Sequence, residues 1–181
     1  MHKWSTRPWL MMLGMAPLLV ACGEPEPPKP QTGTAGAALD SAALLAAPHP
    51  TALLQVFKSP SCGCCEGWIE HAGDAGLTTQ AQHPADLAGL KTQYGIAAQY
   101  RSCHTAVSAD GYVFEGHVPA RYVQAFLAEP PAQAIGLAVP GMPVGSPGME
   151  MGDDFMPYAV MLLKEGGGAE VYAQIDSPAD Q

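Results

Sequence analysis

Three of the chain's five cysteines lie within four positions, and this cluster constrains the fold more than any other stretch. The stretch reads SPSCGCCE, so Cys62 and Cys65 stand at Cys-x-x-Cys spacing with Cys64 between them. The apolar run before it predicts a buried strand, and the residues after it predict a helix. The thiols are therefore expected at a strand-to-helix turn, where the unpaired N–H groups and the dipole of the helix favour thiolate.

Thiolates at this turn suit two chemistries. Soft thiolates select Cu(I), zinc or iron–sulfur clusters, and a Cys-x-x-Cys pair also suits dithiol redox chemistry. With Cys103 added, two structural disulfides are the simplest alternative in an exported protein, but a bridge between the adjacent Cys64 and Cys65 is strained. An all-cysteine zinc site is a second alternative. Such sites usually use two separated pairs, whereas the spacing here is three plus one.

The N-terminus has the pattern of a bacterial lipoprotein signal. Lys3 and Arg7 precede an apolar run, residues 9–20, that is too short to span a bilayer and has the proportions of a signal-peptide core. The run leads into Leu-Val-Ala-Cys, which resembles a lipobox with Cys22 as the lipidated residue. Gly23 follows, with no aspartate to retain the protein in the inner membrane. The resemblance therefore implies a lipid anchor in the outer membrane, facing the periplasm.

These patterns divide the chain into four parts. Residues 1–21 are predicted to be the signal peptide, and residues 22–50 a tether rich in Pro and Ala. Residues 51–129 are predicted to fold as a domain, followed by a metal-binding extension and closing hairpin over residues 130–176. Without the signal peptide, the chain has six basic and 17 acidic residues, a net charge of −11. This acidic balance argues against nucleic acid as a partner, and the lipid anchor is the only membrane contact expected.

The folded part predicts an α/β class with the element order β-α-β-α-β-β-α. The expected strands are 53–58, 77–82, 102–107 and 112–117, and the expected helices are 64–75, 83–93 and 120–128. By analogy as well as by pattern, cysteines at the first strand-to-helix turn are typical of a thioredoxin-like domain. Residues 130–157 predict a long Met/Gly/Pro loop without strands or helices. Strands 158–164 and 169–175, around three glycines, predict a β-hairpin extension.

Two histidines and three methionines complete the candidate metal ligands, namely His104, His117, Met142, Met149 and Met151. His104 adjoins Cys103, and His117 lies on the strand expected to pair with that segment. Both rings are therefore expected near the thiolates, and imidazole suits copper. The methionines lie on the long loop, where no helix face would bury them, and thioethers prefer Cu(I). The ordinary alternatives are surface or hydrogen-bonded histidines and methionines that fill the core.

Five segments of the chain resemble the CopG-like family of periplasmic copper-resistance proteins. They read VFKSPSCGCC, SCHT, GHVPA, VPGMP and GSPGM, and the resemblance covers residues 53–175. It implies a thioredoxin-like fold and a C-terminal extension that contributes to metal binding. It also implies a cysteine-bridged, multinuclear copper cluster beside the CxCC motif. Its bridging thiolates would come from Cys62, Cys64, Cys65 and Cys103, and His and Met residues would fill the outer positions.

The resemblance further implies interconversion of Cu(I) and Cu(II) in copper detoxification. Cys62 and Cys65 are expected to be the catalytic, redox-active pair, and copper ions the substrate. Periplasmic copper-efflux or chaperone proteins are the expected partners. Three other functions remain open. They are a copper carrier or buffer without redox turnover, a metal-free thiol–disulfide oxidoreductase using the same two cysteines, and a zinc-stapled interaction domain.

Overall fold

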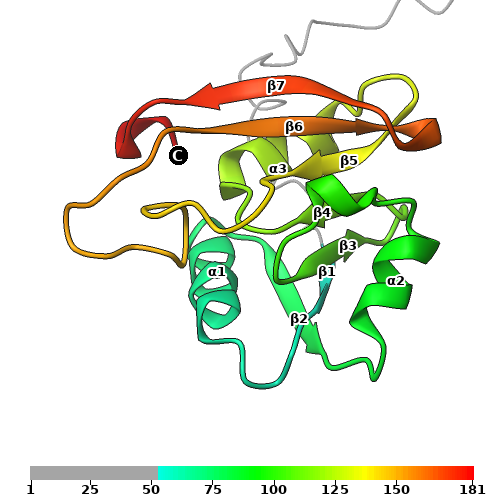
Figure 1. Cartoon of the computed structure of the whole chain (residues 1–181), viewed down its shortest axis with the longest axis horizontal. Coiled ribbons are helices and arrows are strands. Elements are labelled where there is room, and N and C mark those ends of the chain that lie inside the picture. Colours follow the sequence, from blue (N-terminus) through cyan, green and yellow to red (C-terminus); the bar gives the residue numbers. More distant parts are fainter. Residues whose placement is uncertain (1–52) are drawn as a thin grey trace, which may run out of the picture. The chain divides into compact units, whose positions relative to one another are not determined.

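A seven-stranded mixed sheet runs through residues 53–181, the part of the chain that the computed structural model describes (Figure 1). The strand order is β2-β1-β3-β4-β5-β6-β7. The strands are β1 (Leu53–Phe57), β2 (Thr78–Gln82), β3 (Thr105–Ser108), β4 (Val113–Glu115), β5 (Ala134–Ala138), β6 (Tyr158–Lys164) and β7 (Ala169–Ile175). Three α-helices accompany them within the same residues: α1 (Gly63–Asp74), α2 (Leu87–Gln93) and α3 (Ala120–Ala128). The predicted signal peptide, Cys22 and the tether lie outside the described residues.

The main core follows one row of residues that pair across five neighbouring strands. This row consists of Val56, Ala106, Phe114, Leu137 and Leu162. All five are buried, and they pack with Trp68 of α1 and with Val123 and Phe126 of α3. A fully buried Leu or Phe side chain contributes about 2 kcal/mol. Helices α1 and α3 therefore cover one face of the sheet.

The opposite face of the sheet carries a second, smaller core. Successive strand residues point to opposite faces, so Val107, Val113 and Leu163 lie on the other side from their neighbours in the first row. These side chains pack with Ile96 and, at the edge, with Tyr94, in the segment that follows α2. This segment is thereby fixed close to the loop that carries Cys103.

Several predicted elements are confirmed, and two begin three or four residues later than predicted. Helix α3 and the hairpin strands β6 and β7 have the predicted bounds. The helix predicted over 83–93 begins only at Leu87, because the Asp86 carboxylate accepts a hydrogen bond from the Gly89 N–H at 2.7 Å and caps the helix there. The strand predicted from residue 102 begins at Thr105, so Cys103 and its neighbours lie on a loop.

The prediction of a structureless loop over residues 130–157 is wrong in its first part. Strand β5 pairs in parallel with β4 and antiparallel with β6, so the C-terminal extension completes the sheet. Gly136 permits this close pairing, since a Cβ atom there would lie on the Val113 carbonyl oxygen. Residues 139–157, called the 139–157 loop below, are irregular apart from an isolated bridge between Met151 and Asp154.

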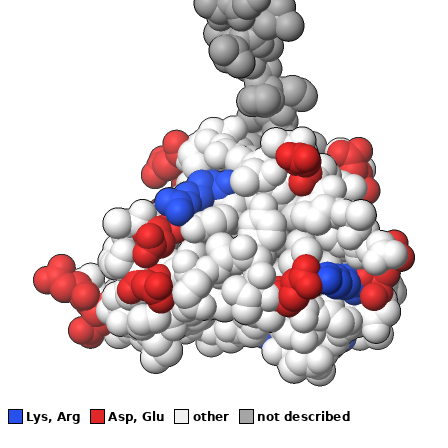
Figure 2. Space-filling model, turned by 90° about the horizontal axis from the view of Figure 1, so that it is seen from above, with Lys and Arg blue, Asp and Glu red and all other residues white. Residues whose placement is uncertain are grey.

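The described surface carries few cationic side chains. On the face shown in Figure 2, acidic groups are scattered between uncharged ones, and the few basic groups lie beside acidic ones. On the β6–β7 hairpin, Lys164 pairs with Glu170, with 2.5 Å between Nζ and Oε2. Among residues 53–181, no helix has the length and apolar character needed to cross a bilayer.

Candidate metal centre

Four cysteine sulfurs converge at the N-terminus of α1. Cys62 and Cys65 form a disulfide, whereas Cys64 and Cys103 carry free thiols. The Cys103 Sγ atom lies 3.4 Å from the Sγ of Cys65 and 3.8 Å from that of Cys64. The Sγ atoms of Cys62 and Cys64 are 3.5 Å apart. All four sulfurs lie within 4.8 Å of one another, so the structure brings together the four cysteines that the sequence singled out.

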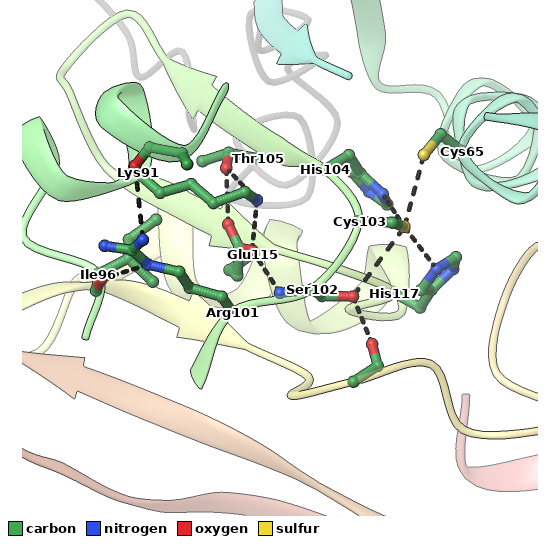
Figure 3. Close-up of polar contacts among 12 residues, drawn as sticks. Cys65, Lys91, Ile96, Arg101, Ser102, Cys103, His104, Thr105, Glu115 and His117 are labelled. Atoms are coloured by element: carbon green, nitrogen blue, oxygen red, sulfur yellow. Dashed lines mark hydrogen bonds and ion pairs between the residues drawn. The ribbon is translucent and has the colours of Figure 1, made fainter. Parts of the chain in front are cut away.

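Two buried imidazoles face the sulfur of Cys103 (Figure 3). Its Sγ lies 3.3 Å from Nδ1 of His104 and 3.1 Å from Nε2 of His117. The Nδ1 atom of His117 lies 2.8 Å from the Pro147 carbonyl oxygen, which can only accept. His117 therefore donates through Nδ1, and the lone pair of Nε2 is directed at the cysteine.

Burial sets the protonation of these groups. It lowers the pKa of His104 and of His117. The nearby His117, Lys91 and Lys58 add to this shift at His104, whereas the Pro147 carbonyl and Glu150 oppose it at His117. Burial, together with the nearby Cys64, raises the pKa of the Cys103 thiol to about 12. Neutral imidazoles are ready to bind a metal ion, but the Cys103 proton has to leave when the ion binds.

The three candidate methionines lie on the 139–157 loop. Met142 and Met151 are 53% and 62% exposed, and Met149 is half-buried. Exposure keeps the first two thioethers in solvent rather than in the buried part of the cysteine–histidine cluster. The structure therefore gathers the predicted cysteines and histidines at one point but leaves these two methionines at its surface.

Backbone contacts attach the 139–157 loop to the cluster. Besides the Pro147 carbonyl that accepts from His117, the Gly141 carbonyl accepts a hydrogen bond from the Ser102 hydroxyl. A Cβ atom on Gly148 would lie 2.5 Å from the carbonyl oxygen of Cys64 and 2.5 Å from the amide nitrogen of Trp68. The loop therefore packs directly on the first turn of α1, where only a glycine fits.

Buried charges around the centre were not identified from the sequence. Lys58 is 1% exposed, donates to the Ser59 carbonyl at 3.0 Å and pairs with the Glu66 carboxylate at 2.7 Å. Glu115 is fully buried and pairs with Lys91 of α2 at 2.5 Å. Two features of the sequence could have indicated this pair. One is a glutamate within an apolar strand, and the other is a lysine beside the apolar positions of a helix. Such charges are rarely buried unless they are paired.

Burial raises the pKa of the Glu115 carboxyl, while Lys91, Thr105 and Ser102 oppose that shift by charge and by hydrogen bonds. The ammonium group and both hydrogen-bond donors lie within 2.6 Å of the carboxylate oxygens. These contacts favour the ionised pair.

The fold and this centre define a mixed α/β protein whose cysteine–histidine cluster is able to hold a metal ion. Two solved structures described as "Copper resistance protein copG", forms 2 and 1, are similar to the chain, with TM-scores of 0.66 and 0.65. Both are 40% identical to it, and the matches cover 70% of this chain and 99% and 98% of theirs. The chain therefore belongs to the CopG family of copper resistance proteins, and the predicted family and α/β class are confirmed.

Two further comparisons add little about function. Residues 100–149 match a family model described as "Protein of unknown function, DUF411". No curated protein matches the chain. The matched segment nevertheless contains Cys103, His104 and His117, together with the Gly/Pro part of the 139–157 loop.

Proposed function

We propose that the protein binds several copper ions through Cys62, Cys64, Cys65, Cys103, His104 and His117. The observation that carries this proposal is that Cys103 belongs to two ligand groups, one of four sulfurs and one with both histidines. A thiolate shared between two such groups can bridge neighbouring ions. Sulfur and imidazole ligands suit Cu(I), and the relatives are described as copper resistance proteins.

The proposal includes electron exchange between copper and the pair Cys62–Cys65. In the oxidising direction, the two thiolates form the disulfide and release two electrons, which reduce two Cu(II) ions to Cu(I). In the reverse direction, two Cu(I) ions supply two electrons, the S–S bond breaks and two thiolates return. The disulfide is the oxidised state of this cycle, and its reduction makes all four sulfurs available as ligands.

Met142, Met149 and Met151 are proposed as outer thioether ligands that approach the copper ions as the loop adjusts. The lipobox pattern supports a periplasmic protein anchored through Cys22, most simply to the outer membrane. In that compartment, copper-efflux or chaperone proteins are the partners proposed to deliver and receive the ions.

Anaerobic Cu(I) titration of the fully reduced protein tests the binding site. The variants Cys64→Ser and Cys103→Ser each remove one proposed bridge, and Ser61→Ala on the same turn is the matched control. Lower copper stoichiometry in both cysteine variants, with the control unchanged, supports the site. Unchanged stoichiometry in both cysteine variants refutes it.

A second experiment separates the electron-exchange function from its alternatives. Cu(II) is added to reduced protein, and the remaining thiols and the Cu(II) paramagnetic signal are counted. The proposal predicts two thiols lost for every two Cu(II) ions reduced, and no such loss in Cys65→Ser. A carrier binds copper without losing thiols. A metal-free oxidoreductase exchanges disulfides without copper and retains this activity in Cys103→Ser. A zinc-stapled domain contains zinc when purified and unfolds on chelation.

A further inference from the structure

One buried carboxylate brackets the segment that carries Cys103 and His104. An oxygen of Glu115 accepts from the Ser102 N–H at 2.6 Å, and its other oxygen accepts from the Thr105 hydroxyl at 2.6 Å (Figure 3). The two donors stand immediately before and after the Cys–His pair. Both ends of this short loop are therefore fixed to a single rigid group on β4.

Lys91 of α2 neutralises this carboxylate. Its Nζ lies 2.5 Å from Oε1 of Glu115 and 3.0 Å from Oγ1 of Thr105, and the lysine is 4% exposed. Two charges removed from water cost desolvation energy, so an apolar pair of similar volume would often stabilise the fold equally well. An apolar pair has no acceptors for Ser102 and Thr105. The ion pair therefore fixes the two ends of the loop by hydrogen bonds that an apolar pair could not make.

The two hydrogen bonds from Ser102 and Thr105 to Glu115, called the bracket below, are supported by further contacts on both sides. The Gly116 N–H, next to Glu115, donates to the His104 carbonyl at 2.9 Å. On the other side, the Arg101 guanidinium donates to the Ile96 carbonyl at 3.0 Å and to the Thr92 hydroxyl at 2.8 Å, which connects the loop to α2. The position of the Cys–His pair is thus set by elements that contribute no metal ligand of their own.

We propose that Glu115, with Lys91 as its counter-ion, is a positioning residue that holds the Cys103 thiol and the His104 ring in register with the three sulfurs at the N-terminus of α1. This inference rests on the proposed copper binding. Removing a hydrogen-bond partner behind the ligands of a metal site typically lowers metal affinity by about 10- to 100-fold. The bracket acts on the loop as a whole, so an effect within that range is expected.

The test uses the full chain and measures Cu(I) affinity by competition with a coloured chelator, together with the thiolate-to-copper absorption. Glu115→Gln removes the charge and one acceptor, and its affinity is expected to fall by about 10- to 100-fold. Thr105→Val removes only the hydroxyl, so a smaller fall with a shifted absorption is expected. Glu170→Gln makes the same chemical change in the exposed Lys164–Glu170 pair and is expected to leave both readouts unchanged.

Hydrogen exchange of the Ser102 N–H, measured without copper, keeps the two proposals distinguishable. Faster exchange is expected in Glu115→Gln but not in Glu170→Gln. If the wild-type chain takes up no copper, the proposed function fails, while faster exchange still supports the bracket. If Glu115→Gln does not fold, as judged by circular dichroism, Thr105→Val decides. Wild-type copper affinity, absorption and Ser102 exchange in the folded variants would overturn the positioning role.

Discussion

At the residue scale, Cys103 belongs to the candidate metal centre and also lies next to the buried polar group around Glu115. Its sulfur contacts two cysteines of α1 and both buried imidazoles. Ser102 and Thr105, the residues that flank the Cys103–His104 pair, both donate to Glu115. The thiol is half-buried, so an ion reaching the centre contacts a group already fixed in place. Such preorganisation favours binding because little side-chain freedom remains to be lost.

Tyr158 offers a residue-scale test of how buried polar groups affect this fold. It is 7% exposed, burial raises the pKa of its phenol, and its hydroxyl has no hydrogen-bond partner within the described residues. An unpaired buried hydroxyl costs about 1–3 kcal/mol. Tyr158→Phe is therefore expected to raise the free energy of unfolding by about 1 kcal/mol, as measured by urea denaturation.

Tyr122→Phe is the matched control for this experiment. The Tyr122 hydroxyl donates to the Asp180 carbonyl at 2.8 Å and accepts from Arg121 at 2.8 Å. Its removal is expected to lower the free energy of unfolding by about 1 kcal/mol, opposite in sign to the change at Tyr158. A loss of stability in Tyr158→Phe would show that its hydroxyl has a partner after all.

At the element scale, the 139–157 loop depends on one glycine. Gly148 has φ +83°, and an added Cβ would meet the backbone of α1 at 2.5 Å. Gly148→Ala therefore combines the cost of a left-handed residue with overpacking, together about 3 kcal/mol. The expected result is a lower free energy of unfolding together with weaker Cu(I) binding, because the carbonyl that orients His117 belongs to the adjacent Pro147.

Gly152→Ala separates conformational cost from contact in this loop. Gly152 has φ +63° and open space around the added Cβ, so only the backbone cost of about 1–2 kcal/mol is expected. Its Cu(I) affinity is expected to match that of the wild-type chain in the same chelator competition. Equal losses of copper affinity in the two variants would contradict a specific role for the contact between Gly148 and α1.

The elements also show which parts of the fold local sequence patterns can predict. The cysteine turn, α3 and the final hairpin follow from their periodicity and their glycines, which act over a few residues. Strand β5 was missed because AIGLA lies among prolines and glycines, and its strand character depends on pairing with β4 and β6. Helix α2 was predicted to begin too early because the His83-Pro84 pair also has the pattern of a helix start. The structure uses the later cap at Asp86 instead.

The grouping of the cysteines and the two histidines could be predicted from the sequence, whereas the residues that hold their loop in place could not. Cys103 could be grouped with the CxCC turn because it is the remaining cysteine of the predicted domain and because the family resemblance implies it as a bridging thiolate. Its position beside the turn depends on the antiparallel pairing of β3 with β1. Lys91 and Glu115 could not be joined in this way. They lie 24 positions apart, and their pairing depends on how α2 packs over the sheet, which no local pattern specifies.

At the whole-molecule scale, the N-terminal sequence predicts a lipidated chain. Cys22→Ser removes the only proposed acylation site, so the variant is expected to lose incorporation of labelled fatty acid and to leave the membrane fraction. The wild-type chain serves as the reference, and Cys64→Ser, which removes a different thiol, is expected to remain in that fraction. Membrane association of Cys22→Ser without fatty-acid incorporation would contradict the lipobox interpretation.

Acid should destabilise the metal-free, disulfide form of the whole molecule. Burial lowers the pKa of His71, against the opposing charges of Glu150 and Asp74, and its Nε2 accepts a hydrogen bond from the Ala120 N–H at 3.0 Å. With a folded pKa below the unfolded value of about 6.5, the unfolded chain binds more protons. Stability is therefore complete above that pH and falls as the pH drops from it towards the folded pKa. His104 and His117 shift in the same direction.

Replacing His71 isolates one share of this acid dependence. Glutamine offers an acceptor for the Ala120 N–H but does not titrate, so His71→Gln is expected to flatten the fall in urea midpoint as the pH drops below about 6.5. His104 and His117 contribute to the remaining slope, and Glu115, whose folded pKa is raised by burial, contributes with the opposite sign. His83→Gln, at an exposed histidine, is the matched control. An unchanged slope in His71→Gln, or an equal flattening in His83→Gln, would show that the contact between α1 and α3 does not carry this dependence.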